Sequence, residues 1–181
     1  AISKYMGKQV YATLPIEAGG VNSMIPIAVA AQLGLPMIDA DGMGRAFPEL
    51  QMVTFHLHGI SAAPMAMVDE KGNHVLLEVI SNKWAEYIAR SVTVAMGASA
   101  MVGIYVMNGA QLKASGIHGI VSYSEQLGRM IRESRIAGES PLNKLVDYTG
   151  GYSLFRGKMV DVNRNTEGGF NRGVVRMEGL E

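Results

Sequence analysis

The spacing of apolar residues along the chain predicts an alternation of strands and helices. Apolar and β-branched residues dominate positions 10–17, so we expect a strand there, which a pair of glycines ends. Asn22 and Ser23 are helix N-cap residue types, and the apolar run after them predicts a helix over 24–33. Positions 35–39 are typical of a short buried strand. The chain therefore begins as a strand, helix, strand unit.

The middle of the chain continues this alternation. Its helix over 83–96 places Trp84, Ile88 and Val92 four residues apart, so we expect these side chains to face the core. The elements predicted here are a helix over 48–59, a hairpin of strands 64–69 and 74–80, a helix over 83–96 capped by Asn82, a strand over 99–107, a helix from Ser122 or Ser124 to 136, and a short helix over 141–148.

From position 150 onward the pattern changes to alternating β residues separated by glycine turns. We expect a domain boundary near 149, with an α/β domain over 1–149 and a β-rich segment over 150–181. Such a short segment does not close a core alone, so it must pack on another part of the protein. The chain starts without Met and soon enters an extended segment, which predicts that it is a piece of a longer polypeptide.

Charge and composition exclude several function classes. The 181 residues hold 16 Lys and Arg against 16 Asp and Glu, so there is no excess of positive charge for binding nucleic acid or an anionic membrane surface. The absence of cysteine excludes disulfides, thiolate nucleophiles and cysteine-bound metals. Two uncharged stretches, 18–38 and 91–112, are long enough to span a bilayer but contain many Gly, Ser, Asn and Gln residues, so we assign them to a soluble core. No signal peptide is visible, and a cytoplasmic location is expected.

The densest group of chemically useful residues lies over positions 39–52. Asp39 ends the predicted strand and Asp41 follows it, and the glycines after them allow a turn that brings Arg45 back over both carboxylates. Glu49, at the start of the next predicted helix, is able to join them. We expect Asp41 to project beyond the sheet while Asp39 lies deeper. Such a group can move protons, hold a polar substrate or bind a hard divalent cation at Asp39 and Asp41. The alternative is a purely structural ion-pair network.

Other candidate sites have weaker patterns. Glu17 and Asn22 flank a glycine pair before a helix N-terminus, an arrangement that suits an anionic or amide ligand and is equally typical of a simple turn and cap. His56 and His58 would share one face only on a strand, so the predicted helix argues against a shared metal. Neither a calcium-binding loop nor a complete phosphate-binding glycine motif is present.

These same residues carry a family resemblance. The runs 17–23, 34–36 and 39–52, with the Asp69 to Asn73 turn, resemble the S-methyl-thiohydantoin desulfurase family, which is associated with hydantoin utilisation. The resemblance covers the central portion of the family's longer chains. It implies a three-layer α/β domain followed by the start of a β-rich, barrel-like domain, and chemistry on a hydantoin-type cyclic amide or its sulfur analogue.

The sequence thus leads to two hypotheses. In the first, the protein is a desulfurase-like or hydrolase-like enzyme on a small cyclic amide, with Asp39, Asp41 and Glu49 in acid-base roles. Arg45, Glu17 and Asn22 then bind the substrate, no cofactor is specified, and the chain forms a homo-oligomer or packs on missing parts of its own longer chain. In the second, the protein is a non-catalytic binding or assembly module in which the same cluster is structural.

Overall fold

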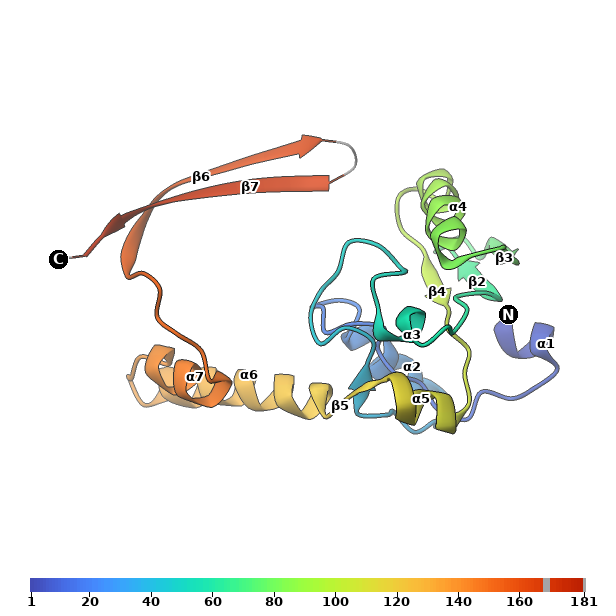
Figure 1. The fold of residues 1–181 in the computed structure, drawn as a ribbon, viewed down its shortest axis with the longest axis horizontal. Coiled ribbons are helices and arrows are strands. Elements are labelled where there is room, and N and C mark those ends of the chain that lie inside the picture. The colour runs from blue at the N-terminus through green and yellow to red at the C-terminus, as the bar shows by residue number, and fades with distance from the viewer. Residues whose placement is uncertain (168–169, 181) are drawn as a thin grey trace. The chain divides into compact units, whose positions relative to one another are not determined.

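The computed structural model describes residues 1–167 and 170–180, and it confirms the expected mixture of helices and sheets (Figure 1). The chain folds as two compact units, Ala1–Gln126 and Leu127–Glu181. The sheets formed by the described residues are small and open, and none of them closes into a barrel. The three-layer arrangement and the domain boundary near 149 stay predictions.

The first unit holds most of the helices and two of the three sheets. Its helices are α1 (Ile2–Met6), α2 (Met24–Leu33), α3 (Thr54–Leu57), α4 (Asn82–Ala95), α5 (Gly109–Ser115) and the first turns of α6 (Ile120–Ile136). Its strands are β1 (Ala40–Asp41), β2 (Met65–Val68), β3 (His74–Leu77), β4 (Met101–Gly103) and β5 (Ile117–His118). One antiparallel sheet has the order β3-β2-β4, and β1 pairs with β5 in another.

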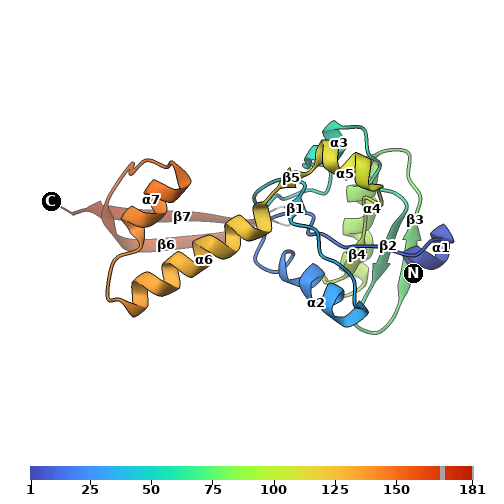
Figure 2. The same ribbon diagram turned by 90° about the horizontal axis from the view of Figure 1, so that it is seen from below.

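The predicted hairpin is confirmed as β2 and β3. Met65 pairs with Leu77, and the ladder runs to the turn that the Asp69 carboxylate closes by accepting from the backbone N–H of Asn73 at 2.8 Å. The core forms where α4 runs beside the three-stranded sheet (Figure 2), with Met65, Met67 and Ala85 inaccessible to solvent. Among the described residues, no helix combines the length and apolar character needed to cross a bilayer.

The helix predicted over 48–59 is wrong for its first half. Only α3 is helical, and Val53 before it is extended, with φ −135° and ψ 155°. The carbonyl oxygens of Pro48 and Leu50 accept from the Arg90 guanidinium and the Tyr105 hydroxyl, so these two acceptors are bonded to distant side chains rather than to a helical ladder. Tertiary contacts therefore override the local preference.

The helix over 83–96 is confirmed as α4, but its cap and its inward face differ from the prediction. Ser81 is the N-cap, and its hydroxyl accepts from the backbone N–H of Trp84. Trp84 is 51% exposed, Val92 packs against the core as expected, and the most buried apolar positions are Ala85 and Ala89. Asn82 is buried, and its amide binds the backbone on either side of Ser61, at Ala62 and Ile60. The Asn82 side chain therefore connects α4 to the segment around Ser61 instead of capping the helix.

Two predicted strands are shorter than expected. Segment 10–17 reduces to one parallel bridge between Thr13 and Met37, because Pro15 has no N–H for a continued ladder. Strand 99–107 reduces to β4, since Tyr105 adopts a left-handed φ of 53°. Helix α5, in a segment to which the sequence analysis assigned no element, begins at a reciprocal capping box of Asn108 and Gln111.

The second unit holds the end of α6, helix α7 (Leu142–Thr149) and the hairpin β6 (Gly157–Glu167) with β7 (Phe170–Gly179). The short helix after Pro141 and the β-rich segment are thereby confirmed. The hairpin ladder is long, with Met159 opposite Met177 and Val162 opposite Val175. These four apolar side chains are all exposed.

Candidate functional site

Asp41 lies at the end of β1, and its side chain is completely buried. Its Oδ1 accepts from the backbone N–H of Met43 at 3.1 Å and of Gly44 at 2.8 Å, which fixes the turn after the strand. Its Oδ2 is buried and has no hydrogen-bond partner within the described part of the chain. Burial raises the pKa of Asp41, the charge of Glu17 adds to that rise, and the N–H groups of Gly44, Met43 and Ala18 oppose it.

The turn after Asp41 needs glycine at two positions for different reasons. A Cβ on Gly42 would lie 2.7 Å from the Phe55 ring and 3.0 Å from the Cβ of Val53, so the core leaves no room for one. Gly44 has a left-handed φ of 71°, which side chains disfavour. The sharp turn expected from the sequence is therefore present.

A second buried carboxylate, Glu17, holds the next part of the same loop. Its Oε2 accepts from the backbone N–H of Phe47 at 2.8 Å, and its Oε1 accepts from the Asn22 amide at 2.5 Å. The Ser23 hydroxyl donates to the Glu17 carbonyl oxygen at 3.1 Å. The structure thus brings the predicted pair Glu17 and Asn22 together, beside Asp41.

Helix α4 holds the end of the loop. The Glu86 carboxylate, which is buried, accepts from the backbone N–H of Leu50 at 2.9 Å and from Nε of Arg90 at 2.7 Å. Arg90 also donates to the Pro48 carbonyl at 3.0 Å, and the hydroxyl of buried Tyr105 donates to the Leu50 carbonyl at 2.9 Å. Side chains from three distant segments therefore fix residues 39–51, which we call the anchored loop.

Arg45 is exposed between these anchors. No ion pair or hydrogen bond joins its guanidinium to Asp39, Asp41 or Glu49 in the described structure. Glu49 is half-buried and accepts from the Gln51 amide. The expected ion-pair network around Arg45 is therefore not formed. The Arg45 side chain is exposed, while hydrogen bonds hold the backbone on either side of it.

The relative depths expected for Asp39 and Asp41 are reversed. Asp39 is exposed, and its Oδ1 accepts from the backbone N–H of Val121 at 2.8 Å and of Ser122 at 3.1 Å, while the Ser122 hydroxyl donates to Oδ2. These hydrogen bonds lower the pKa of Asp39. Asp39 thus caps α6 from a distant position, and the prediction that Ser122 or Ser124 caps that helix is wrong. Ser124 donates instead to the Ile120 carbonyl.

The histidines do not form a metal centre with other ligands. Within residues 1–167 and 170–180, no three His, Asp or Glu side chains gather at metal-binding distance. His56 is part of α3 and its Nδ1 lies 2.9 Å from the Asn82 amide nitrogen, while His58 follows the helix end.

Sequence reasoning missed Glu86, Arg90 and Tyr105. The first two lie four residues apart on a helix, a spacing that signals an ion pair, but nothing in the sequence shows which loop they hold. The acid-base roles of Asp39, Asp41 and Glu49, and the binding roles of Arg45, Glu17 and Asn22, stay predictions.

A solved structure shares this fold. A crystal structure of a protein from Chromobacterium violaceum matches with a TM-score of 0.75 and 24% sequence identity, over 98% of this chain and 48% of that one. This chain therefore spans about half the length of that protein. A search of curated proteins finds no match.

Two family models together cover the whole chain. Residues 1–79 match the model described as S-Me-THD-like, N-terminal domain, and residues 80–181 match S-Me-THD-like, C-terminal domain. The two matches meet between β3 and α4. The resemblance drawn from the sequence is thereby confirmed over the whole of this chain. The chain belongs to the S-Me-THD-like family, that of the S-methyl-thiohydantoin desulfurases.

Proposed function

We propose that this chain forms part of an enzyme acting on a hydantoin-type cyclic amide or its S-methylated thio analogue. The family name supports the substrate class. The observation that carries the residue assignment is the carboxyl group of Asp41, which has two N–H donors on one oxygen and no partner on the other within the described structure. Because the chain spans about half of a similar solved protein, other parts of that length are expected to complete the site.

The proposed reaction replaces sulfur by oxygen on the ring. Water adds to the ring carbon that carries the S-methyl group, the carbon–sulfur bond breaks, and methanethiol leaves after taking a proton. The products are the hydantoin and methanethiol, so atoms balance without an oxidant or reductant. The chemistry needs one group that gives a proton to sulfur and one that takes a proton from water.

We assign these roles from burial and charge. Asp41 has a raised pKa, so it holds its proton at higher pH than an ordinary carboxyl group and suits the proton donor. Glu49, half-buried on the same loop, suits the base that activates water. Arg45 suits the group that holds the ring carbonyl, because it is exposed on the anchored loop and its guanidinium offers several N–H donors.

A direct test measures methanethiol release from an S-methyl-thiohydantoin by the full-length protein and its Arg45→Met variant. We expect release by the wild type and at least a tenfold loss of kcat/KM in the variant. Arg132→Met, on the exposed surface of α6, is the matched control. Absence of release by the wild type, or equal rates in both variants, contradicts the proposal.

One observation favours the second candidate, a non-catalytic module. Asp41, Glu17 and Asp39 all accept hydrogen bonds from backbone N–H groups, as structural carboxylates do. Asp41 is also sealed from solvent. In this alternative the carboxylates only hold the loop, and replacing them changes stability without changing a reaction.

A further inference from the structure

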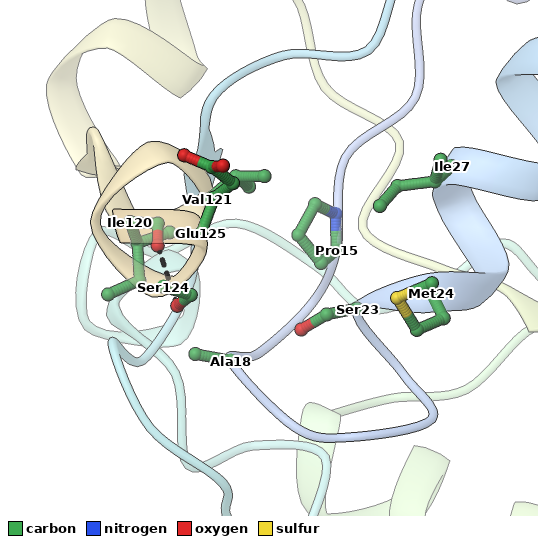
Figure 3. Close-up of a pocket in the computed structure, with 9 residues that line it drawn as sticks. All are labelled: Pro15, Ala18, Ser23, Met24, Ile27, Ile120, Val121, Ser124 and Glu125. Carbon is green, nitrogen blue, oxygen red and sulfur yellow. Dashed lines mark hydrogen bonds between the residues drawn. The ribbon is translucent and has the colours of Figure 1, made fainter. Parts of the chain in front are cut away.

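A cleft of about 330 Å³ lies in the first unit, between the start of α2, residues 15–18 and the first turns of α6 (Figure 3). Its walls are mainly apolar. Pro15 lies between the two helices, with Met24 and Ile27 on the α2 side and Ile120 and Val121 on the α6 side.

The polar side chains of this cleft are already hydrogen-bonded within the chain. The Ser124 hydroxyl donates to the Ile120 carbonyl at 2.8 Å, and the Ser23 hydroxyl donates to the Glu17 carbonyl at 3.1 Å. Glu125 is the one charged side chain among the described residues that line the cleft. A ligand there meets mainly apolar surface, which disfavours a charged group because that group would lose its hydration.

The cleft adjoins the carboxylates of the candidate site through its own walls. Ala18, a lining residue, directly follows Glu17, and its backbone N–H faces the Asp41 carboxyl group. Val121, on the opposite wall, donates its backbone N–H to Asp39 at 2.8 Å. Two lining residues are therefore adjacent in sequence or bonded through their backbone to three of the predicted site residues, Glu17, Asp41 and Asp39.

We infer that this cleft binds an uncharged apolar substituent on the ring of the substrate, which makes the enzyme selective for rings with aliphatic side chains. This inference rests on the function proposed above. The volume is enough for a branched alkyl group next to a five-membered ring, and its apolar walls exclude water from that group. Each buried methylene is worth roughly a fourfold gain in kcat/KM, so an isobutyl group gains on the order of a hundredfold at full burial.

The test compares three S-methyl-thiohydantoins, with hydrogen, isobutyl or carboxymethyl on the ring, in the full-length protein. We expect kcat/KM to be at least tenfold higher for isobutyl than for hydrogen, and lowest for carboxymethyl. Ile27→Trp, which fills the cleft, reduces the isobutyl preference to about twofold or less. Leu33→Trp is the matched control, because it lies on the same helix, is exposed and does not line the cleft.

An unchanged isobutyl preference in Ile27→Trp, or no preference in the wild type, overturns the inference while leaving the proposed function intact. If the wild type turns over none of the three compounds, the proposed function fails. In that case, the affinity of the protein for 5-isobutylhydantoin, measured by calorimetry, tests whether the cleft binds an apolar group. Binding that Ile27→Trp weakens at least fivefold and Leu33→Trp does not supports an apolar ligand site, and no binding to the wild type overturns it.

Discussion

The anchored loop and the β6–β7 hairpin are opposites in how they are held. The loop has almost no regular structure, yet side chains at Glu17, Glu86 and Tyr105 bind its backbone from distant segments. The hairpin has a long regular ladder, but its valines and methionines are exposed on the described structure. Regular backbone hydrogen bonding and anchoring by distant side chains are therefore separate properties. A functional site needs the anchoring, because its residues must be held in a fixed geometry.

Among the contacts that hold the anchored loop, the largest effect is expected for Glu86→Ala. The change leaves the Leu50 N–H without its acceptor and Arg90 without its carboxylate, so we expect a loss of about 2 to 3 kcal/mol in the free energy of unfolding. The loosened loop also exposes the bond after Arg45 to trypsin. Urea denaturation and mass mapping of a brief digest measure both effects, with Glu133→Ala on α6 as an exposed control. A stable variant that resists cleavage at Arg45 would show that α4 does not hold the loop.

A smaller loss is expected for Asp39→Ala, which removes the cap of α6. Two backbone N–H groups, at Val121 and Ser122, lose their acceptor, and lost caps cost about 1 kcal/mol. Asp39→Asn retains one acceptor oxygen and is expected to lose less. Hydrogen exchange at the amides of Val121 and Ser122 is the measurement, and equal exchange in all three proteins contradicts the capping role.

The two aspartates of the loop are expected to respond to pH in opposite directions. Because the folded pKa of Asp39 is lowered, its stabilisation is present above the unfolded pKa and is lost as pH falls through the folded value. Because the folded pKa of Asp41 is raised, its contribution is present below the unfolded pKa and is lost as pH rises through the folded value. From pH 7 to pH 3, Asp39→Asn should lose less stability than the wild type and Asp41→Asn should lose more. Unfolding curves across this range check the signs, and shifts of equal sign refute the assignment.

The smallest effect is expected in the hairpin. Met159→Ala removes a side chain that is 57% exposed, so the free energy of unfolding should change by less than about 0.5 kcal/mol. Met67→Ala in β2, where the side chain is inaccessible, is the matched comparison and should lose about 2 to 5 kcal/mol. A large loss at Met159 in the full-length protein would show that another surface covers the hairpin there. It would support the expectation that the segment packs on a further part of the protein.

Local patterns predicted the elements whose signals are local. The β2–β3 hairpin has its Asp69 turn, α4 has its apolar spacing, and α7 follows Pro141. The helix over 48–59 failed because the side chains of Arg90 and Tyr105 bind the carbonyl oxygens of Pro48 and Leu50, and such contacts have no signature in a local window. Helix α5 was predictable, because the capping box of Asn108 and Gln111 is visible in the sequence, but no element was assigned to residues 109–115.

The sequence predicted a candidate site over residues 39–52 but not the geometry that the structure gives these residues. Asp39 and Asp41 lie two residues apart, and only the structure shows that one reaches the N-terminus of α6 while the other turns into the core. The close approach of Gly42 to Phe55 explains why the turn carries glycine there. The role of Glu86 was unpredictable, because a helical ion-pair spacing does not reveal a third partner.

The central claim is that Asp41 is a chemical group and not only a support for the loop. Asp41→Asn tests it most directly, because asparagine keeps an oxygen for the N–H groups of Met43 and Gly44 while it removes the titratable proton. In the full-length protein, with stability and methanethiol release measured on the same sample, we expect a stability change within about 1 kcal/mol and a fall in turnover of about a hundredfold or more. A marked loss of stability with unchanged turnover per folded molecule, or no change in either, would contradict the account.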